Sequence, residues 1–212
     1  MTMAIRLPRI YPITDKKLAG RATHLSILKE LVRGGAQLVQ IRDKDTPLDR
    51  LLADLRSCVE FASKHGVRIL VNDRCDLVLS SGADGVHLGQ QDLPPVAARR
   101  LLGPDRIIGY STHSMREAEK SSGAPVDYIG FGPIFATTTK TDPARVVGLT
   151  RLKQVCNHSA TPVVAIGGIG LDQVAAVLNA GAASAAVISG LMRAKNLARQ
   201  MEEFLKQAMV KP

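Results

Sequence analysis

A pair of aspartates is the clearest candidate for chemistry in this sequence. Asp73 comes directly after the apolar run at 69–71, and Asp92 ends the motif GVHLGQQD at 85–92. Two carboxylates at one site suit Mg²⁺, which takes one or two of them together with water and substrate phosphate oxygens. The pair could instead serve as general acid and base, or each aspartate could cap the helix that follows it. We expect Mg²⁺, because cationic side chains follow neighbouring apolar runs.

The motif QIRDK at 40–44 supplies the first of these cations. Strand alternation points Gln40, Arg42 and Lys44 to one side. An Arg binds phosphate through two parallel hydrogen bonds, whereas a Lys acts as a mobile point charge. Taken alone, the motif could also be a solvated charged loop.

Side chains with hydroxyl groups follow two further apolar runs of the sequence. Ser111 lies in GYSTHS at 109–114, where its hydroxyl and a helix N-terminus could receive a phosphate oxygen. The alternative is a plain helix N-cap at Ser111 or Thr112, and we expect His113 to support the site or cap a helix. The loop GFGPIFATTTK at 130–140 adds three hydroxyls and a cation.

Glycine-rich turns at 166–170 and 187–190 let backbone N–H groups approach a ligand. Together with the cationic side chains, these turns predict two anion sites in a single pocket. A monophosphate would lie near Gly168 and Ser189. A polyanion such as pyrophosphate would lie near Arg42, Lys44, Lys140 and the two aspartates.

The elements that must position these residues alternate regularly. The apolar runs predict eight strands, at 10–14, 38–42, 68–71, 85–88, 107–110, 128–130, 163–166 and 185–188. Helical periodicity predicts helices between them, at 24–33, 48–64, 96–102, 115–122, 149–156, 171–179 and 191–209. Strict alternation indicates parallel strands joined by helical crossovers.

A Gly-Ala pair precedes every second strand, at 35–36, 82–83, 123–124 and 181–182. We interpret each pair as a helix end with its Gly in the left-handed conformation. The repetition of this Gly-Ala pair before every second strand favours a closed sheet. We therefore predict one α/β domain over residues 1–212, a single (β/α)₈ TIM barrel with its active site in the loops after the strands.

Composition agrees with this fold and narrows the partners. The 212 residues are 45% hydrophobic and 3% aromatic, without Trp, so Val, Ile, Leu and Ala must build the core. The net charge of +9 favours anionic partners. Without Lys/Arg runs or many aromatic residues we expect phosphorylated metabolites and no nucleic acid. Three dispersed cysteines and no apolar run of membrane-spanning length predict a cytoplasmic protein without membrane contact. The sequence does not predict an oligomeric state.

The chain resembles thiamine phosphate synthases along essentially its whole length. The resemblance rests on the order and location of YPITD (11–15), QIRDK (40–44), ND (72–73), GVHLGQQD (85–92), GYSTHS (109–114), GFGPIFATTTK (130–140), AIGGI (165–169) and VIS (187–189). It implies a transferase of thiamine biosynthesis. Such an enzyme joins 4-amino-2-methyl-5-(diphosphooxymethyl)pyrimidine to a thiazole phosphate, either 4-methyl-5-(2-phosphooxyethyl)thiazole or its carboxylated form. The products are thiamine monophosphate and pyrophosphate, formed with Mg²⁺ by breaking the carbon–oxygen bond first.

The resemblance also implies roles for individual residues. Arg42, Lys44, Ser111 and Lys140 would be catalytic, by holding the pyrophosphate. The pyrimidine diphosphate would contact Gln40, Ile41, Arg42, Asp43, Lys44, Asn72, Ser111 and Lys140. The thiazole phosphate would contact Thr137, Thr138, Thr139, Gly168, Ile188 and Ser189. The metal ligands would be Asp73 and Asp92.

Two departures from the family pattern stand out, Ala136 where Pro is common and Arg74 where a second acid is common. Neither removes a polar group assigned above. Two other functions remain open. A thiazole tautomerase on the same barrel would use His113 as acid and base, and a non-catalytic phosphometabolite-binding protein would need only the anion site.

Overall fold

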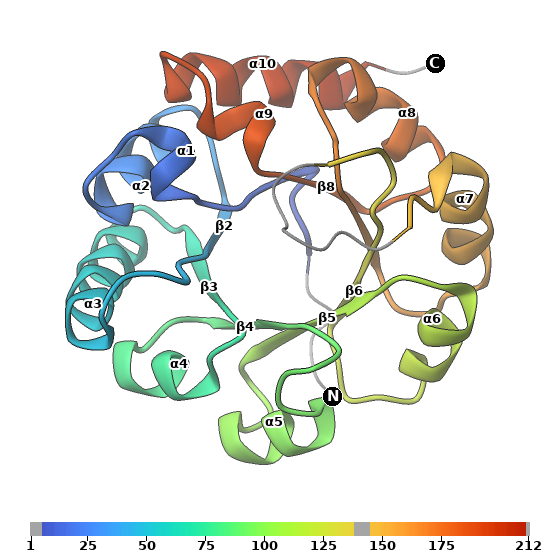
Figure 1. Ribbon diagram of the computed structural model, residues 1–212, viewed down its shortest axis with the longest axis horizontal. Coiled ribbons are helices and arrows are strands. Elements are labelled where there is room, and N and C mark those ends of the chain that lie inside the picture. The colour runs from blue at the N-terminus through green and yellow to red at the C-terminus, as the bar shows by residue number, and fades with distance from the viewer. Residues whose placement is uncertain (1–5, 138–144, 211–212) are drawn as a thin grey trace.

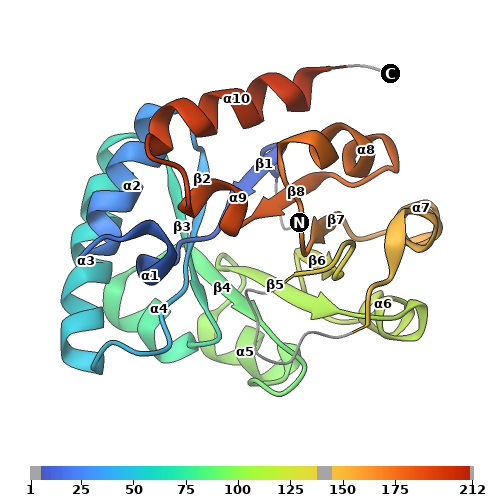
Figure 2. The same ribbon diagram turned by 45° about the horizontal axis from the view of Figure 1, so that its top comes forward.

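The computed structural model describes residues 6–137 and 145–210, which form a barrel of eight parallel strands surrounded by helices (Figures 1 and 2). The strands are β1 (Ile10–Pro12), β2 (Leu38–Ile41), β3 (Arg68–Asn72), β4 (Gly85–Leu88), β5 (Ile107–Thr112), β6 (Tyr128–Phe131), β7 (Val163–Ile166) and β8 (Ser184–Val187). All eight predicted strands are confirmed, with ends shifted by at most two residues.

Closure of the ring is the feature that separates a barrel from an open sheet. Strand β1 pairs with β8 in parallel, with Tyr11 opposite Ala186. On its other side the chain just after β1 meets β2 through a single parallel bridge between Ile13 and Gln40, and the Thr14 N–H donates to the Gln40 carbonyl at 2.9 Å. The predicted barrel is therefore confirmed, and its closing contact lies at the ends of β1 and β2, where the candidate site begins.

The helices lie outside the ring. They are α1 (Lys16–Ala19), α2 (His24–Arg33), α3 (Leu48–Lys64), α4 (Cys75–Ser81), α5 (Pro95–Leu102), α6 (Met115–Ser121), α7 (Gly148–His158), α8 (Val174–Asn179), α9 (Ser189–Met192) and α10 (Leu197–Met209), with a 3₁₀ turn η1 (Leu171–Gln173) before α8. The bounds predicted for α2 and α3 are confirmed, and the short helices α1 and α4 were not predicted. No helix among the described residues is long and apolar enough to cross a membrane.

One predicted helix, 191–209, is wrong as a single element. The chain forms α9 and then starts again at α10, because the Asn196 side chain accepts a hydrogen bond from the Arg199 N–H at 3.0 Å and caps a new helix. This break leaves α9 as a separate short helix directly after β8, inside the ring of longer helices (Figure 2).

The Gly-Ala punctuation is confirmed at three of its four positions. Gly35, Gly82 and Gly181 have positive φ angles of 94°, 80° and 102°. Gly123 does not, because Ser122, the residue after α6, is right-handed and a hydrogen bond from the Ala124 N–H to the Ser121 carbonyl at 3.1 Å closes the turn.

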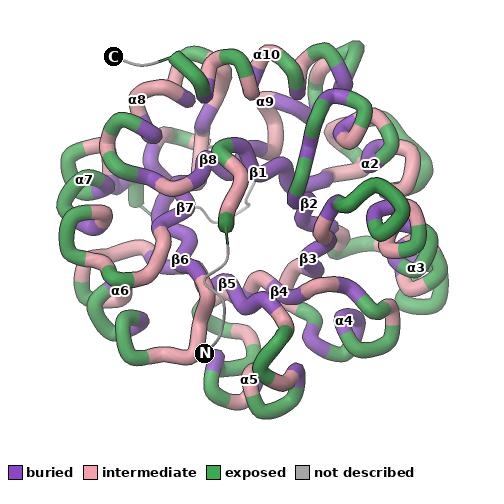
Figure 3. Tube along the Cα trace, turned by 180° about the vertical axis from the view of Figure 1, so that it is seen from behind, coloured by how far each residue is buried: buried purple, intermediate pink, exposed green. Residues whose placement is uncertain are grey.

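Two apolar layers form the core. The larger lies between the strands and the helices, and most residues in the ring of strands are buried (Figure 3). The smaller fills the barrel interior with Tyr11, Ile13, Leu38, Leu70, Ile107, Tyr128, Val164 and Ala186. The prediction of an aliphatic core holds for the outer layer, whereas two tyrosines occupy the interior.

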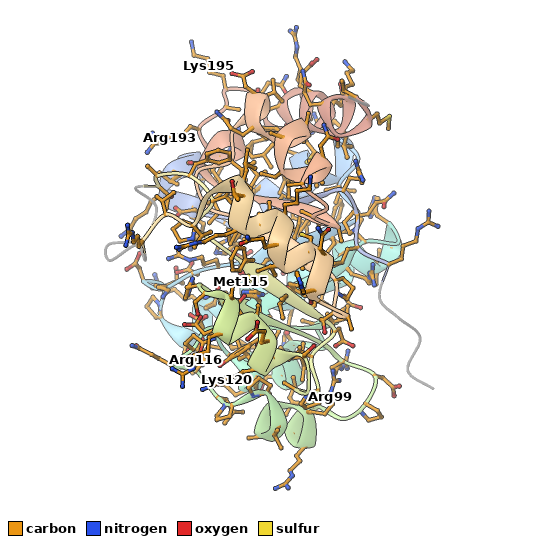
Figure 4. The ribbon with its side chains drawn as sticks, turned by 90° about the vertical axis from the view of Figure 1, so that its right-hand side faces the viewer. Arg99, Met115, Arg116, Lys120, Arg193 and Lys195 are labelled. Atoms are coloured by element: carbon orange, nitrogen blue, oxygen red, sulfur yellow. The ribbon has the colours of Figure 1, made fainter. Side chains whose placement is uncertain are left out.

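Arg99 of α5 links several loops at one end of the barrel, the end opposite the carboxyl ends of the strands. Its guanidinium donates to the carbonyl oxygens of Gly103, Arg106 and Pro125 and to the Asp127 carboxylate, the last at 2.8 Å. Figure 4 shows Arg99 and Arg193, the residue that follows α9, on opposite sides of the molecule. The loops that hold the barrel together at Arg99 are thus remote from the loops that carry the candidate site.

Candidate active site

A cavity of about 780 Å³ opens at the carboxyl ends of the strands and takes lining residues from all eight of them. Most of the side chains predicted for the anion and metal sites meet here. Those lining the cavity are Gln40, Arg42, Lys44, Asn72, Asp73, Asp92, Ser111 and Ile188, together with His113. Residues spread over nearly 150 positions of the sequence are thus brought to one mouth.

The remaining predicted residues lie elsewhere. The side chains of Ile41 and Asp43 are not among those that line the cavity, because strand alternation turns Ile41 into the outer core and Asp43 toward α1 and α2. Gly168 and Ser189 belong to the turns after β7 and β8, and Thr137 follows β6. Thr138, Thr139 and Lys140 lie outside the described residues.

The two aspartates lie beside each other. Burial raises the pKa of the Asp73 carboxyl above its usual value, the adjacent Asp92 carboxyl raises this pKa further, and Lys44 and Arg42 oppose the rise. The Lys44 ammonium is 3.6 Å from Asp73 Oδ2. Two carboxylates that repel each other in a partly buried position favour a bound cation, which would relieve the repulsion.

Neither aspartate caps a helix. The N-cap positions of α4 and α5 are Arg74 and Pro94, and neither helix has a side-chain cap. Asp92 instead accepts a hydrogen bond from the Gly89 N–H at 2.6 Å, which folds the loop after β4 back on itself. Among the described residues Asp73 is the only non-glycine residue with a positive φ, 65°. A positive φ is uncommon for residues other than glycine, although Asp adopts it more readily than most of them.

The described residues contain no cluster of three or more His, Cys, Asp or Glu side chains suited to a metal. A cation between Asp73 and Asp92 would therefore take its other ligands from water and from the substrate. Mg²⁺ is commonly bound in this way, because it dehydrates reluctantly and often takes one or two carboxylates plus phosphate oxygens as ligands. The donor set fits Mg²⁺ on a phosphorylated substrate better than a metal held by the protein alone.

Asp43 anchors the loop that carries the cations. Its Oδ2 lies 3.0 Å from Lys16 Nζ and 3.0 Å from His24 Nε2, and it accepts the Thr46 hydroxyl at 2.7 Å. Although burial raises the pKa of the Asp43 carboxyl, the hydrogen bonds from Thr46, from the Asp45 N–H and from Lys16 outweigh it and hold this pKa well below its usual range. The carboxylate is thus a fixed negative charge behind Arg42 and Lys44.

Ser111 is not a helix cap, so the alternative interpretation of its hydroxyl as an N-cap is wrong. Strand β5 runs to Thr112, two residues further than predicted, because Ser111 and Thr112 pair with Gly130 and Phe131 of β6. The cap of α6 is Ser114, whose hydroxyl accepts the Glu117 N–H at 3.2 Å.

A row of hydrogen bonds in the barrel interior ends at the hydroxyl of Ser111. Gln40 Nε2 donates to Tyr11 Oη at 2.8 Å, and Tyr11 Oη lies 2.9 Å from Tyr128 Oη. Tyr128 Oη lies 2.9 Å from His87 Nδ1, and His87 Nε2 lies 2.9 Å from Ser111 Oγ. We call these five side chains the relay. It joins β2, β1, β6, β4 and β5 across the barrel interior, and Gln40, Tyr11, His87 and Ser111 line the cavity.

Two glycines make room for the relay. A Cβ at Gly109 would lie 2.1 Å from Tyr128 Cζ and 2.6 Å from His87 Nδ1, and a Cβ at Gly130 would lie 3.1 Å from His87 Cε1. Both rings occupy space that any other residue would fill. The glycines of GYSTHS and GFGP therefore serve the site through packing.

The loops after β6, β7 and β8 close the other side of the mouth. The Ile134 and Phe135 N–H groups donate to the carbonyl oxygens of Ile166 and Gly167 at 2.9 and 3.0 Å. Gly168 has φ 64°, and a Cβ there would lie 2.3 Å from the Ala136 carbonyl oxygen. The Gly-rich turn after β7 thus packs against the backbone that leads into Thr137, while α9 begins at Ser189 beside Ile188.

His113 also faces the cavity. Its Nδ1 lies 2.7 Å from the Gly132 carbonyl oxygen, and since a carbonyl only accepts, Nδ1 is protonated. The His113 N–H donates to Glu117 Oε2 at 2.7 Å. These bonds support the predicted role of His113 in holding the start of α6.

Three relay residues, Tyr11, Tyr128 and His87, were given no role in the sequence analysis. Period-two alternation within β4 could have placed His87, because Val86 and Leu88 belong to the outer core and the residue between them must face the interior. No sequence signal pairs Tyr11 with Tyr128, which are 117 residues apart.

Comparison with known proteins agrees with this geometry. The sequence model of the family described as thiamine monophosphate synthase matches residues 10–191. A thiamine-phosphate synthase of Albidiferax ferrireducens is 42% identical over 188 residues, which cover 89% of this chain and 86% of that protein. One of Anaeromyxobacter dehalogenans is 46% identical over 177 residues, 84% and 79% of the two chains.

Solved structures show the same likeness. A thiamine phosphate pyrophosphorylase from Pyrococcus furiosus superposes with a TM-score of 0.86 at 33% identity, covering 95% of this chain and 97% of that one. The N-(5'-phosphoribosyl)anthranilate isomerase of the same organism superposes with a TM-score of 0.64 at 14% identity over 95% and 98% of the chains, a likeness of fold alone.

Proposed function

The chain belongs to the thiamine monophosphate synthase family, and from that premise we propose that this transferase joins 4-amino-2-methyl-5-(diphosphooxymethyl)pyrimidine to a thiazole phosphate. The products would be thiamine monophosphate and pyrophosphate. The thiazole partner would be 4-methyl-5-(2-phosphooxyethyl)thiazole or its carboxylated form. One observation carries the proposal: cations and two adjacent carboxylates line the same cavity, an arrangement that suits a metal-bound pyrophosphate.

The pyrophosphate would lie on the side of the cavity formed after β2, β3 and β5. Arg42, Lys44 and Ser111 would bind its oxygens there, joined by Lys140. Asp73 and Asp92 would hold Mg²⁺, which neutralises charge that gathers on a departing diphosphate. Arg42 is itself oriented by Asp15, whose Oδ2 lies 3.6 Å from Arg42 Nη1.

The pyrimidine ring would lie deeper, against Gln40 and Asn72. Gln40 gives its amide nitrogen to Tyr11, which leaves its carbonyl oxygen to accept from an amino group. Asn72 ends β3, pairs with His87 of β4 and lines the same cavity.

The thiazole phosphate would lie across the mouth, against Gly168, Ile188, Ser189 and Thr137, where Gly168 packs against Ala136 and Gly190 packs against Ile169. Barrel enzymes often bind a phosphate at the loops after the seventh and eighth strands, because backbone N–H groups are free there. The residues Thr138 and Thr139 complete the proposed set.

In the mechanism we propose, the carbon–oxygen bond breaks first and the thiazole nitrogen captures the resulting pyrimidinylmethyl cation. Such a reaction needs no protein nucleophile. It needs donors fixed in advance where negative charge develops and two reactants held in line. Arg42, Lys44 and Ser111 supply the donors. The cysteines have no role in it, since burial raises the pKa of each thiol and keeps it protonated.

The proposal is tested by incubating the protein with both substrates, with and without Mg²⁺, and measuring pyrophosphate release. We expect release that depends on Mg²⁺ and on both substrates. His113 faces the cavity, which keeps a thiazole tautomerase as the second candidate. Equilibration of thiazole tautomers without pyrophosphate release would establish that function instead, and binding without either reaction would leave a non-catalytic phosphometabolite-binding protein.

Replacing Asp43 should change the KM for only one of the two substrates. We expect Asp43→Asn to raise the KM for the pyrimidine diphosphate about tenfold, because the loop of Arg42 and Lys44 loses its ion pair with Lys16. The KM for the thiazole phosphate should stay within about twofold. Steady-state kinetics with each substrate varied in turn would check this, and Asp49→Asn, in the first turn of α3, is the control. An equal rise in both constants would mean that Asp43 supports the fold and not the loop.

A further inference from the structure

The relay has a direction, and that direction decides where the Ser111 proton points. We propose that Tyr11, Tyr128 and His87 are positioning residues that hold the proton of His87 on Nε2 and thereby leave the Ser111 hydroxyl free to donate into the cavity, toward an oxygen of the departing diphosphate. The identity of that acceptor rests on the proposed function. The direction of the relay does not.

The first link sets the direction. The Gln40 amide nitrogen can only donate, so Tyr11 Oη accepts this bond and must place its own proton elsewhere. Its other partner in the relay is Tyr128 Oη, at 2.9 Å. Tyr11 therefore donates to Tyr128.

Each later link follows from the one before. Tyr128 Oη already receives the Tyr11 proton, so its own proton goes to His87 Nδ1, at 2.9 Å. A neutral imidazole that accepts at Nδ1 has its proton on Nε2. His87 Nε2 then donates to Ser111 Oγ, at 2.9 Å, and the Ser111 proton remains for a partner outside the relay.

The surroundings keep the two phenols of the relay protonated. Tyr11 and Tyr128 are fully buried, and burial raises the pKa of each phenol above its usual value, so both remain neutral. The ring of Tyr128 stacks on His87 with 5.5 Å between centroids and meets Tyr11 edge-on at 5.9 Å. The rings fit in these positions because Gly109 and Gly130 have no side chains.

The consequence concerns the charge that develops during the reaction. A phosphate oxygen only accepts hydrogen bonds, so it gains from a hydroxyl whose proton already points toward it. A serine without a relay could turn its proton to either side, and part of its stabilisation would be lost to reorientation. The relay thus affects kcat, and it should leave the binding of either substrate nearly unchanged.

The direction can be measured without any substrate. Long-range ¹H–¹⁵N correlations of the imidazole rings distinguish the two neutral tautomers, and the signals that disappear in His87→Gln identify His87. We expect the proton on Nε2. A proton on Nδ1 would reverse the links between Tyr11, Tyr128, His87 and Ser111, make Ser111 an internal donor to His87 and overturn the proposal.

The catalytic effect is tested with tyrosine variants and a double-mutant cycle. Tyr128→Phe keeps the ring but removes the link to His87, and we expect kcat to fall about tenfold with both KM values within about twofold. Tyr11→Phe, one link further away, should lower kcat only about twofold. Tyr110→Phe is the matched control, since Tyr110 lies on β5 outside the relay.

Ser111→Ala separates a role through Ser111 from an independent one. In that background Tyr128→Phe should lower kcat by less than about twofold, because the residue through which it acts is gone. A further tenfold loss would show independent effects and overturn the proposal. If Tyr128→Phe does not fold, the wild-type tautomer decides the matter. Absence of pyrophosphate release by the wild type would refute the proposed function and leave the tautomer result standing.

Discussion

Replacing Asp92 by alanine is expected to lower kcat about a thousandfold while leaving the KM for the thiazole phosphate within about twofold. The proposed Mg²⁺ would lose one of two protein carboxylates, and the described residues offer no third acidic ligand in its place. The half-saturating Mg²⁺ concentration should rise at least about tenfold. Measuring pyrophosphate release against Mg²⁺ and against each substrate would test all three expectations.

Two further variants separate the charge of Asp92 from its hydrogen bond. Asp92→Asn can still accept the Gly89 N–H, so it should keep the loop after β4 in place and yet lose nearly as much activity as the alanine variant. Asp76→Ala removes an acidic side chain of α4 that is paired with Arg74 and does not line the cavity. It should behave as the wild type. A parallel loss of turnover and of thiazole phosphate affinity in Asp92→Ala would contradict the division of the mouth into two anion sites.

Replacing Ser189 by glutamate is expected to raise the KM for the thiazole phosphate about a hundredfold. Ser189 begins α9 beside Ile188, where the phosphate would lie. A carboxylate a few ångströms from a phosphate at a protein surface costs about 3 kcal/mol, which corresponds to about a hundredfold in affinity. The KM for the pyrimidine diphosphate should stay within about twofold, because that substrate would bind on the opposite side of the cavity.

The matched control for this variant is Ser189→Gln, which has the size of glutamate without its charge. We expect it to raise the same KM by less than about tenfold. If glutamate and glutamine raise it equally, steric exclusion explains the effect. If neither changes it, the phosphate does not bind at α9 and the assignment of Gly168 and Ser189 fails.

Most of the fold could be predicted because it depends on local periodicity. Strands such as β4 and β7 and helices such as α2 and α3 have the predicted bounds, since alternation of period two and apolar spacing of period 3.6 are properties of the chain itself. The break between α9 and α10 was missed because it depends on a single side-chain cap at Asn196 within an otherwise helical pattern.

The cavity-lining residues were predictable for the same reason. Gln40, Arg42 and Lys44 alternate along one strand and its loop, and in a parallel barrel the carboxyl ends of all strands meet at one end. The sequence alone therefore determined which residue types reach the mouth, and the pairing of Asp73 with Asp92 followed from adjacent strand ends.

Contacts across the barrel were decided only by the tertiary structure. The register of β5 against β6 took Ser111 out of a helix cap and placed its hydroxyl on His87. Strand alternation turned Asp43 away from the cavity, but only the packing of α1 and α2 gave it Lys16 and His24 as partners. Tyr11 and Tyr128 meet because β1 and β6 face each other across the interior. Periodicity tells which face of a strand a residue occupies, but which residue it meets depends on the register and packing of the whole closed sheet.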